Sequence, residues 1–275
     1  MKPPNGPSKL IGAPLRAILL GSLLLLGGFV LNEMRVRQPI TPLRLFADRV
    51  RAGAYLGRTL VVGGLFSMFF FLSQYLQGVH GYSALGTGIA FLPMTTVMFA
   101  MVRLGPRLAA TIGNRVLLSG GVAVAAAGMA WMSRLSETGG YFPQIAVPLV
   151  VVGAGIGASY APLTALGITG VAREDAGTAA GLVNAAQQLG GSLGLGVLVT
   201  VFASAGAAAV RHLPAGATAG QIAAAGLAHG TATALLGSTV LLALALLVSV
   251  TMIRLRDPAQ HPETRTPASR RVRGQ

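Results

Sequence analysis

The residues best suited to chemistry in this 275-residue chain are amides that lie inside apolar segments. The stretch "GLVNAAQQLGGSLG" (181–194) carries Asn184, Gln187 and Gln188 within a sequence that otherwise has the composition of a membrane helix. An amide that faces lipid finds no hydrogen-bond partner, so these side chains should point toward other helices or toward water. They can hold a solute or a neighbouring helix by hydrogen bonding, but they are neither nucleophiles nor general acids.

The groups that most enzymes use are missing from the apolar segments. All seven acidic residues fall in predicted loops or tails, and there is no cysteine. The four histidines lie far apart, without the spacing of metal ligands: His80, His212, His229 and His261. The sequence therefore predicts a protein that is not an enzyme and that needs no metal and no cofactor. Intramembrane carboxylates are the usual proton carriers of pumps, so no proton relay is evident either.

The composition predicts an all-α integral membrane protein. The chain is 53% hydrophobic and 10% charged, whereas a soluble domain has about 25% charged residues. Long stretches such as 59–102 and 212–253 contain no charge at all, and a span needs about 20 apolar residues. We expect about seven transmembrane helices, near residues 14–31, 55–77, 85–102, 116–133, 142–169, 178–205 and 231–253.

The remaining segments complete the predicted organisation. Residues 1–52 form the first span and a basic cytoplasmic linker, 53–256 a six-helix bundle, and 257–275 a disordered basic tail that is solvated or touches anionic lipid. Residues 206–229 are predicted to be an Ala/Gly-rich outer loop, with room for a short helix after Thr218. The basic start of the chain resembles a signal peptide, but no small-residue cleavage pattern follows it, which favours a retained helix.

The basic residues predict the orientation in the membrane. With the N-terminus outside and the C-terminus in the cytoplasm, 16 of the 21 basic residues, Arg58 among them, fall in cytoplasmic loops or the tail. The net charge of +14 is thereby explained without nucleic acid as a partner. The lipid bilayer is the partner that the composition requires.

Three helices carry stripes of small and polar residues at helical spacing. Small residues allow close helix packing, and amides bind across helices or to water. We expect the polar members to line a shared cavity: Gln74, Gln77, Tyr160, Asn184 and Gln188. We expect the glycines and prolines to give close packing and kinks: Gly63, Pro93, Gly153, Gly157, Pro162, Gly177, Gly181 and Gly191. The alternative is that the amides only join helices to one another.

Three segments together resemble the fourteen-span drug/proton antiporters of the major facilitator superfamily. "FFFLSQYLQGVHGYSALGTGIAFLP" (69–93) resembles their ninth and tenth spans, and "GVAREDAGTAAGLVNAAQQLGGSLGLGV" (170–197) the entry to their thirteenth. "EMRVRQPITPLRLFADR" (33–49) resembles the linker after their eighth span. The likeness covers only the C-terminal half of such a protein, that is, one extra span and the six-helix C-terminal bundle.

The segment "RLGPRLAATIGNRVLL" (103–118) resembles the gating loop of this family, in which a glycine, a leucine, an acid and basic residues recur. Leu108, Gly113 and Arg115 match that pattern, and Arg107 lies within it. Pro106 replaces the first glycine, and Ala110 and Thr111 replace the acid and the arginine after it. The departures remove any charge relay, and the matching residues are left to shape the turn and cap a helix.

The resemblance implies the C-terminal portion of a proton-linked multidrug-type efflux transporter that works by alternating access in a bacterial inner membrane. Its substrate would be a hydrophobic or cationic small molecule, and its partner a complementary N-terminal half or another copy. The proton-coupling acids of the family belong to the first half. Two other hypotheses are a non-transporting membrane scaffold and a gene fragment without function.

Overall fold

The computed structural model describes residues 44–135, 139–214 and 216–253, together with eight helical positions between 21 and 32. The predicted first span and the predicted tail (257–275) therefore lie largely or wholly outside the described residues. Within the described part the chain consists of helices joined by turns and contains no strand. From residue 44 onward the elements are α2 (Arg44–Ala47), α3 (Arg49–Gly78), α4 (Ala84–Ala90), α5 (Leu92–Ile112), α6 (Asn114–Met132), α7 (Ala146–Ile168), η1 (Arg173–Asp175), α8 (Ala176–Arg211) and α9 (Ala219–Met252).

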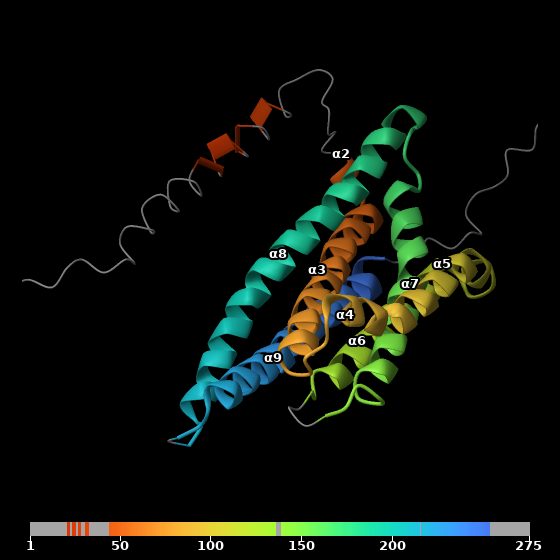
Figure 1. Cartoon of the computed structure of the whole chain (residues 1–275). Coiled ribbons are helices and arrows are strands. Elements are labelled where there is room, and N and C mark those ends of the chain that lie inside the picture. The colour runs from red at the N-terminus through yellow and green to blue at the C-terminus, as the bar shows by residue number, and fades with distance from the viewer. Residues whose placement is uncertain are drawn as a thin grey trace, which may run out of the picture.

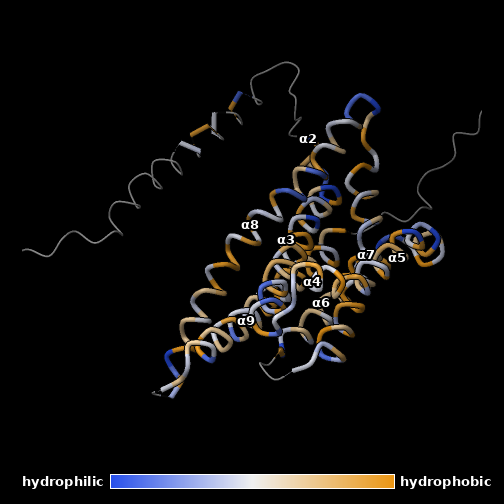
Figure 2. The backbone as a smooth tube through the Cα atoms, viewed as in Figure 1, coloured by the Kyte–Doolittle hydropathy of each residue, from blue (hydrophilic) through white to orange (hydrophobic). Residues whose placement is uncertain are grey.

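The helices are long and apolar enough to cross a membrane. Five qualify singly, and the bent pair α4–α5 makes a sixth, so each predicted span from the second to the seventh corresponds to one of them. Figure 2 shows that hydrophilic backbone positions gather at the turns between helices, whereas the helix centres are mainly hydrophobic. This distribution confirms the predicted class of an all-α multi-pass membrane protein.

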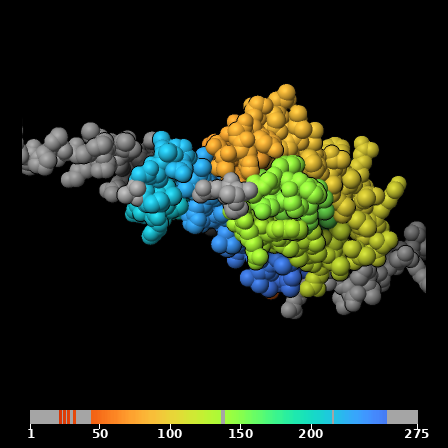
Figure 3. All heavy atoms as spheres, turned by 60° about the horizontal axis from the view of Figure 1, so that its bottom comes forward, coloured from red at the N-terminus to blue at the C-terminus, as the bar shows by residue number. Residues whose placement is uncertain are grey.

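The helix α3 is the central element of the bundle. It packs against α7, α8 and α9, whereas α7 packs against α5 and α6 as well (Figure 1). The main hydrophobic core lies between these helices and includes fully buried Met68, Leu72, Met129 and Leu149. The turn between α8 and α9 protrudes beside the body formed by the other helices (Figure 3).

Two predicted loops are shorter than the sequence suggested. The outer loop predicted at 206–229 is wrong, because α8 continues to Arg211 and α9 begins at Ala219. Alanine-rich sequence is a strong helix former, and Thr218 starts α9 with a capping box in which it exchanges hydrogen bonds with Gln221. The predicted gating loop is likewise almost entirely helical. Only Gly113, with φ of +83°, separates α5 from α6.

A break divides the third predicted span close to Pro93. The axes of α4 and α5 differ by 41°, and Pro93 lies in the first turn of α5, where its missing N–H is tolerated. The hydroxyl of Tyr141 donates a hydrogen bond to the Ala90 carbonyl oxygen at 2.7 Å, beside the break. Burial raises the pKa of Tyr141, and the nearby Tyr82 adds to this, so the hydroxyl keeps the proton that it donates. Pro162, by contrast, lies inside α7, which continues through it.

Glycines allow close approach at two helix contacts. On the α3–α8 contact, a Cβ at Gly194 would lie 2.5 Å from the Cα of Gly63, and its three nearest atoms all belong to the Gly63 backbone, which cannot move aside. On the α5–α7 contact, a Cβ at Gly153 or Gly157 would meet the Met94 or Met98 carbonyl oxygen. Close backbone approach of this kind is how helices pack tightly in a membrane.

Replacement of Gly194 by alanine should destabilise the bundle. The new methyl group would push α3 away from α8, and overpacking of this kind costs about 1–3 kcal/mol. Gly196 is the matched control, because no atom lies within 4 Å of its Cβ position on the same helix. Thermal denaturation of the purified chain in detergent should show a lower midpoint for Gly194→Ala and an equal or higher one for Gly196→Ala. Equal midpoints would contradict the packing role.

Candidate solute-binding site

An arginine lies inside the bundle, although it was counted with the cytoplasmic loops when the orientation was predicted. Arg58 was assigned to a cytoplasmic loop, but it lies within α3, about one turn after Tyr55, and is only 4% exposed. It lies about 8 Å along the axis from the midpoint of this 30-residue helix, given a rise of about 1.5 Å per residue. The assignment was wrong because a charge near the end of an apolar segment can belong to either side of its boundary.

Residues from α7 and α8 surround the guanidinium of Arg58. Its Cζ lies 3.6 Å from the centre of the Tyr160 ring, which gives a cation–π contact. Nη2 donates to the Gln187 Oε1 at 2.8 Å, and Nη1 lies 3.4 Å from both the Tyr160 carbonyl oxygen and the Thr164 Oγ1. We call Arg58, Tyr160, Thr164 and Gln187 the polar cluster. It joins three helices that are far apart in the sequence.

The Gln187 amide is the acceptor at the centre of the polar cluster. Its Oε1 accepts from Arg58 and, at 2.9 Å, from the Tyr160 hydroxyl. Because two donors meet this atom, the oxygen and nitrogen of the amide cannot be exchanged without placing N–H groups against other donors. The orientation of the side chain is therefore determined, and its NH₂ group is on the opposite arm from Arg58.

Neighbouring hydrogen bonds fix the backbones that carry the polar cluster. The Tyr55 hydroxyl donates to the Gly167 carbonyl oxygen at 2.9 Å, which joins the start of α3 to the end of α7. The Thr59 hydroxyl lies within hydrogen-bonding distance of the carbonyl oxygens of Tyr55 and Ala186, at 3.0 and 3.1 Å. The α3–α8 contact is thus polar near the start of α3 and glycine-rich farther along.

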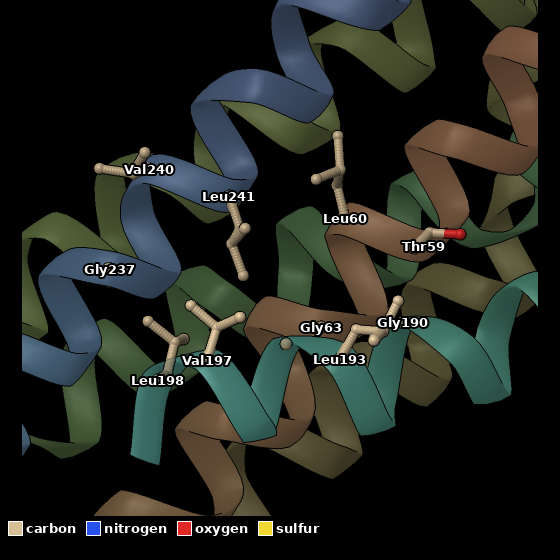
Figure 4. A pocket seen from close by; sticks show the side chains of 11 residues that line it. Thr59, Leu60, Gly63, Gly190, Leu193, Val197, Leu198, Gly237, Val240 and Leu241 are labelled. Atoms are coloured by element: carbon tan, nitrogen blue, oxygen red, sulfur yellow. The ribbon is translucent and has the colours of Figure 1, made fainter. Parts of the chain in front are cut away.

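An apolar groove lies beside the same α3–α8 contact, on the side of α9. It has a volume of about 420 Å³ and lies between α3, α8 and α9 (Figure 4). Leu60, Leu193, Val197 and Leu241 contribute apolar side chains to it, and Thr59, the residue after Arg58, lies at one end. The Thr59 hydroxyl is used by the backbone contacts above, so the groove offers apolar surface only. Such a groove suits an alkyl or aromatic group.

The structure does not bring the five predicted cavity residues together in one place. Tyr160 belongs to the polar cluster. Gln74 and Gln77 are exposed near the end of α3, far along the helix from Arg58, and Asn184 and Gln188 are exposed on α8. The α8 amide that joins the polar cluster is Gln187, which is half-buried and one residue away from the predicted position, because the face of α8 that meets α3 differs by one residue from the predicted stripe.

The predicted packing glycines also divide into two groups. Gly63, Gly153 and Gly157 lie in tight contacts, and a Cβ at Gly191 would lie 3.2 Å from the Phe66 ring. Gly177 and Gly181 have no atom within 4 Å of a Cβ position and are exposed, so they pack no helix within the described part of the chain. They lie on the same open side of α8 as the exposed amides.

The residues of the predicted gating loop lie at the α5–α6 turn. Arg107 is exposed on the last turns of α5, and Leu108 is half-buried beside it. Arg115, in the first turn of α6, donates to the Val250 carbonyl oxygen near the C-terminal end of α9 at 3.3 Å. A cation at this end of a helix supplies a partner for its unpaired carbonyl groups. Arg115 therefore caps α9 rather than its own helix.

A signal for the polar cluster was present in the sequence. Val183, Gln187, Gly190, Gly194 and Leu198 follow steps of 4, 3, 4 and 4, which is also a helical face. Periodicity alone could not decide between this face and the neighbouring one, since both carry glycines and amides. An arginine within reach of that face on another span would have decided it.

The fold and the site define a multi-pass helical membrane protein with a polar cluster and an apolar groove inside its bundle. The sequence matches the Major Facilitator Superfamily over residues 3–195, and the chain belongs to this family of membrane transporters. The family assignment confirms the resemblance seen in the sequence and the expectation of a protein that is not an enzyme.

Several curated relatives are named for drug resistance or export. The chain is 40% identical to the puromycin resistance protein of Streptomyces alboniger over 202 residues. This aligned region covers 72% of this chain and 40% of that protein. It is 37% identical over 188 residues to a cephamycin export protein of Amycolatopsis lactamdurans. The aligned region covers 68% of this chain and 39% of that protein. A tetracenomycin C resistance and export protein of Streptomyces glaucescens is 30% identical over 186 residues, covering 68% and 34%. The matched part of the chain thus spans about two fifths or less of the length of these relatives.

Replacement of Gln187 by leucine should destabilise the chain. The change removes the acceptor shared by Arg58 and Tyr160 and leaves buried donors unpaired, which costs about 1–3 kcal/mol. Gln188→Leu is the matched control, because Gln188 is exposed on the same helix. The thermal midpoint in detergent should fall for Gln187→Leu and stay the same for Gln188→Leu. A larger loss for Gln188→Leu would show that the polar cluster is not formed as described.

Proposed function

We propose that this chain supplies the C-terminal half of a drug exporter that works by alternating access. The relatives named for resistance or export support this, as does the match to about two fifths of their length. The exporter would move small hydrophobic molecules out of a bacterial cell across its inner membrane. The chain would act together with a complementary set of helices, either an N-terminal half or another copy.

The open face of α8 is the observation that carries this proposal. Only 17% of an 18-residue apolar stretch of α8 is buried inside the bundle, against 61% of the corresponding stretch of α3. Asn184 and Gln188 are exposed on α8 together with Gly177 and Gly181. Amides in contact with acyl chains would lack partners, so this face requires protein or water beside it. A second helical bundle that leaves a solute path between the two halves would provide both.

The polar cluster and the apolar groove are the parts of this half that we propose contact the solute. The groove lies between α3, α8 and α9, and the cluster lies between α3, α7 and α8. Family transporters of this type alternate by rocking one bundle against another around a central site. The single-residue turn at Gly113 and the Arg115 contact with α9 would then keep α5, α6 and α9 together as the half moves.

Proton linkage, which the resemblance implies, would depend on acids outside this half. Among the described residues, the acids Asp48, Glu174 and Asp175 lie at the starts of α3 and α8, not in the helix centres. Carboxylates that carry protons through a membrane lie inside the bundle. We therefore assign the proton-carrying groups to the complementary half.

Efflux measurements with and without a complementary half test the proposal. The full chain is expressed in bacteria alone and together with the N-terminal half of a related exporter, and accumulation of a fluorescent hydrophobic drug is measured. Co-expression should lower accumulation, whereas the chain alone should do so only if two copies form a path. Unchanged accumulation in every combination, with both halves present in the membrane, would favour the scaffold hypothesis.

The exposed amides should matter for transport more than for folding. In the active assembly, replacing Asn184 and Gln188 together by leucine should lower transport severalfold, because hydrogen bonding to solute or water is lost, with little change in membrane abundance. The matched control exchanges the two amides, Asn184→Gln with Gln188→Asn, and should retain most of the transport. Equal losses of transport and abundance would show that both residues serve packing.

The proposed orientation, with the N-terminus outside and the C-terminus in the cytoplasm, can be tested by labelling. The chain has no cysteine, so a single introduced cysteine can be labelled without background from other thiols of the chain. Ala219→Cys lies at the α8–α9 turn and Thr111→Cys at the α5–α6 turn, and both positions are exposed. A membrane-impermeant maleimide added to intact cells should label Ala219→Cys, and Thr111→Cys only after permeabilisation. The reverse pattern would invert the orientation.

A further inference from the structure

The apolar groove lies near the middle of each helix that forms it. Its lining comes from residues 59–63 of α3, 190–198 of α8 and 237–241 of α9. With a rise of about 1.5 Å per residue, each of these segments lies within about 8 Å of the midpoint of its own helix. The hydrocarbon layer extends about 15 Å to either side of its centre. The groove is therefore at a depth where hydrocarbon, not water or lipid headgroups, surrounds the bundle.

The groove is on the side of α8 opposite to its exposed amides. Asn184 and Leu193 are nine residues apart, and so are Gln188 and Val197. Nine residues make two and a half turns of an α-helix, so each amide has a groove residue on the other side of the helix. Leu193 and Val197 are 60% and 64% exposed, so the groove is open to the outside of the bundle. The amides require protein or water beside them, which leaves the groove side of α8 to the lipid.

Close backbone contacts separate the groove from the polar cluster. A Cβ at Gly190 would collide with the Thr59 carbonyl oxygen. One turn farther along α8, a Cβ at Gly194 would lie 2.5 Å from the Gly63 Cα. Arg58 is directed toward α7 and α8 and lies on the α7 side of these contacts, whereas the groove lies on the α9 side. The groove therefore shares neither the charge nor the hydrogen-bond donors of the polar cluster.

The lining of the groove offers neither charge nor hydrogen bonds. Apart from Thr59, it consists of glycine, leucine and valine (Figure 4), and the Thr59 hydroxyl is used by backbone carbonyl oxygens. A charged group would find no partner at this depth, where charges are costly. The volume of about 420 Å³ is within the range of sites that hold drug-sized molecules. The groove is thus complementary to an uncharged hydrophobic body.

The depth of the groove favours a molecule dissolved in the membrane over a phospholipid. A phospholipid keeps its headgroup at the surface of the bilayer, so only the end of an acyl chain reaches the helix midpoints. A hydrophobic molecule without a headgroup can place its whole body there. A rigid ring system also loses less conformational freedom on binding than a flexible acyl chain does.

We propose that the apolar groove is a binding site for uncharged hydrophobic molecules that enter it from the hydrocarbon of the bilayer. The ligand lies between α8 and α9, with α3 behind it. The proposal rests on the function above for its role in transport, because it names the class of solute and the side from which that solute reaches this half. At this site it excludes the cationic molecules that the family resemblance allows.

Photolabelling with a competitor tests the site without any transport. The purified full chain in phosphatidylcholine nanodiscs is irradiated with an uncharged aryl diazirine, with and without excess pyrene, and labelled residues are mapped by mass spectrometry. Pyrene should reduce the labelling of Leu193, Val240 and Leu241 severalfold, because these residues line one saturable site. Labelling of Val124, an exposed residue of α6 outside the groove, should not change.

Two results of this experiment would overturn the proposal. Labelling that is equal at exposed positions of α6, α8 and α9, and that pyrene does not reduce, would show that only acyl chains occupy the groove. Protection of the groove residues without competitor, in nanodiscs that hold two copies, would show that a second copy covers it.

The class of ligand is tested with a charged analogue of the competitor. Pyrenesulfonate has the same ring system and is compared with pyrene at the same mole fraction in the lipid. Its charge should keep it away from the helix midpoints, so it should compete much less than pyrene does. Equal competition by the two compounds would contradict a site for uncharged molecules.

A groove-filling variant assigns the labelling to the groove. Val197→Trp places an indole ring beside α9 and should reduce the pyrene-sensitive labelling of Val240 and Leu241 severalfold. Val199→Trp is the matched control, because Val199 is exposed, lies two residues farther along on another side of α8 and does not line the groove. It should keep the labelling. If Val197→Trp does not fold, Val240→Trp fills the groove from α9 and the labelling is read at Leu193.

The outcomes separate this site from the transport function. Pyrene-sensitive labelling that Val197→Trp removes and Val199→Trp retains would support the site even if no complementary half restores efflux. Efflux without pyrene-sensitive labelling, or labelling that both groove-filling variants leave unchanged, would overturn the site while the exporter function stands.

Discussion

The close contact between α3 and α8 determines most of what is distinctive in this structure. Glycines on both helices allow their backbones to meet at Gly63 and Gly194, where a single added methyl group would collide with backbone atoms. Only at this separation does Arg58 of α3 reach the Gln187 amide of α8. The same glycines leave the space beside the contact that becomes the apolar groove. Small residues thus provide both the tight packing and the cavity next to it.

Helices from the first half of the described bundle, α3 to α6, pack against helices from its second half, α7 to α9. The first helix of the bundle, α3, packs against α8 and α9 from the end of the chain, whereas α7 packs against the earlier α5 and α6. Neither half of the sequence therefore forms a separate unit. In space, α3, α8 and α9 form one group of helices and α5, α6 and α7 form the other. Arg58 and Tyr55 tie α3 to α7 across the middle, so the polar cluster is located where the two groups meet. A ligand bound there would contact both groups at once.

Much of this fold could be predicted from the sequence, because spans are determined by long apolar segments and loops by charge. The exceptions share a physical cause. The alanine-rich segment before Ala219 and the arginine-flanked segment around Pro106 look like loops by charge and composition, yet both favour helix once neighbouring turns are helical. The candidate site was predicted less well. A helix face is defined only to within one residue by periodicity, so the sequence did not point to Gln187, which joins the polar cluster beside the predicted Gln188. Arg58 was missed because burial of a charge depends on partners from helices 100 residues away, such as Tyr160.

The length of the last two helices has a consequence for the surrounding lipid. α8 has 36 residues and α9 has 34, which corresponds to about 50 Å or more for each, whereas the hydrocarbon layer is about 30 Å thick. Such helices must tilt or emerge from the bilayer. Because Thr218 and Gln221 cap the start of α9 at the protruding turn, the emerging end is a stiff hairpin rather than a slack loop. A small change in the tilt of these helices would move that tip farther than their centres, so the position of the hairpin would follow the inclination of the whole bundle.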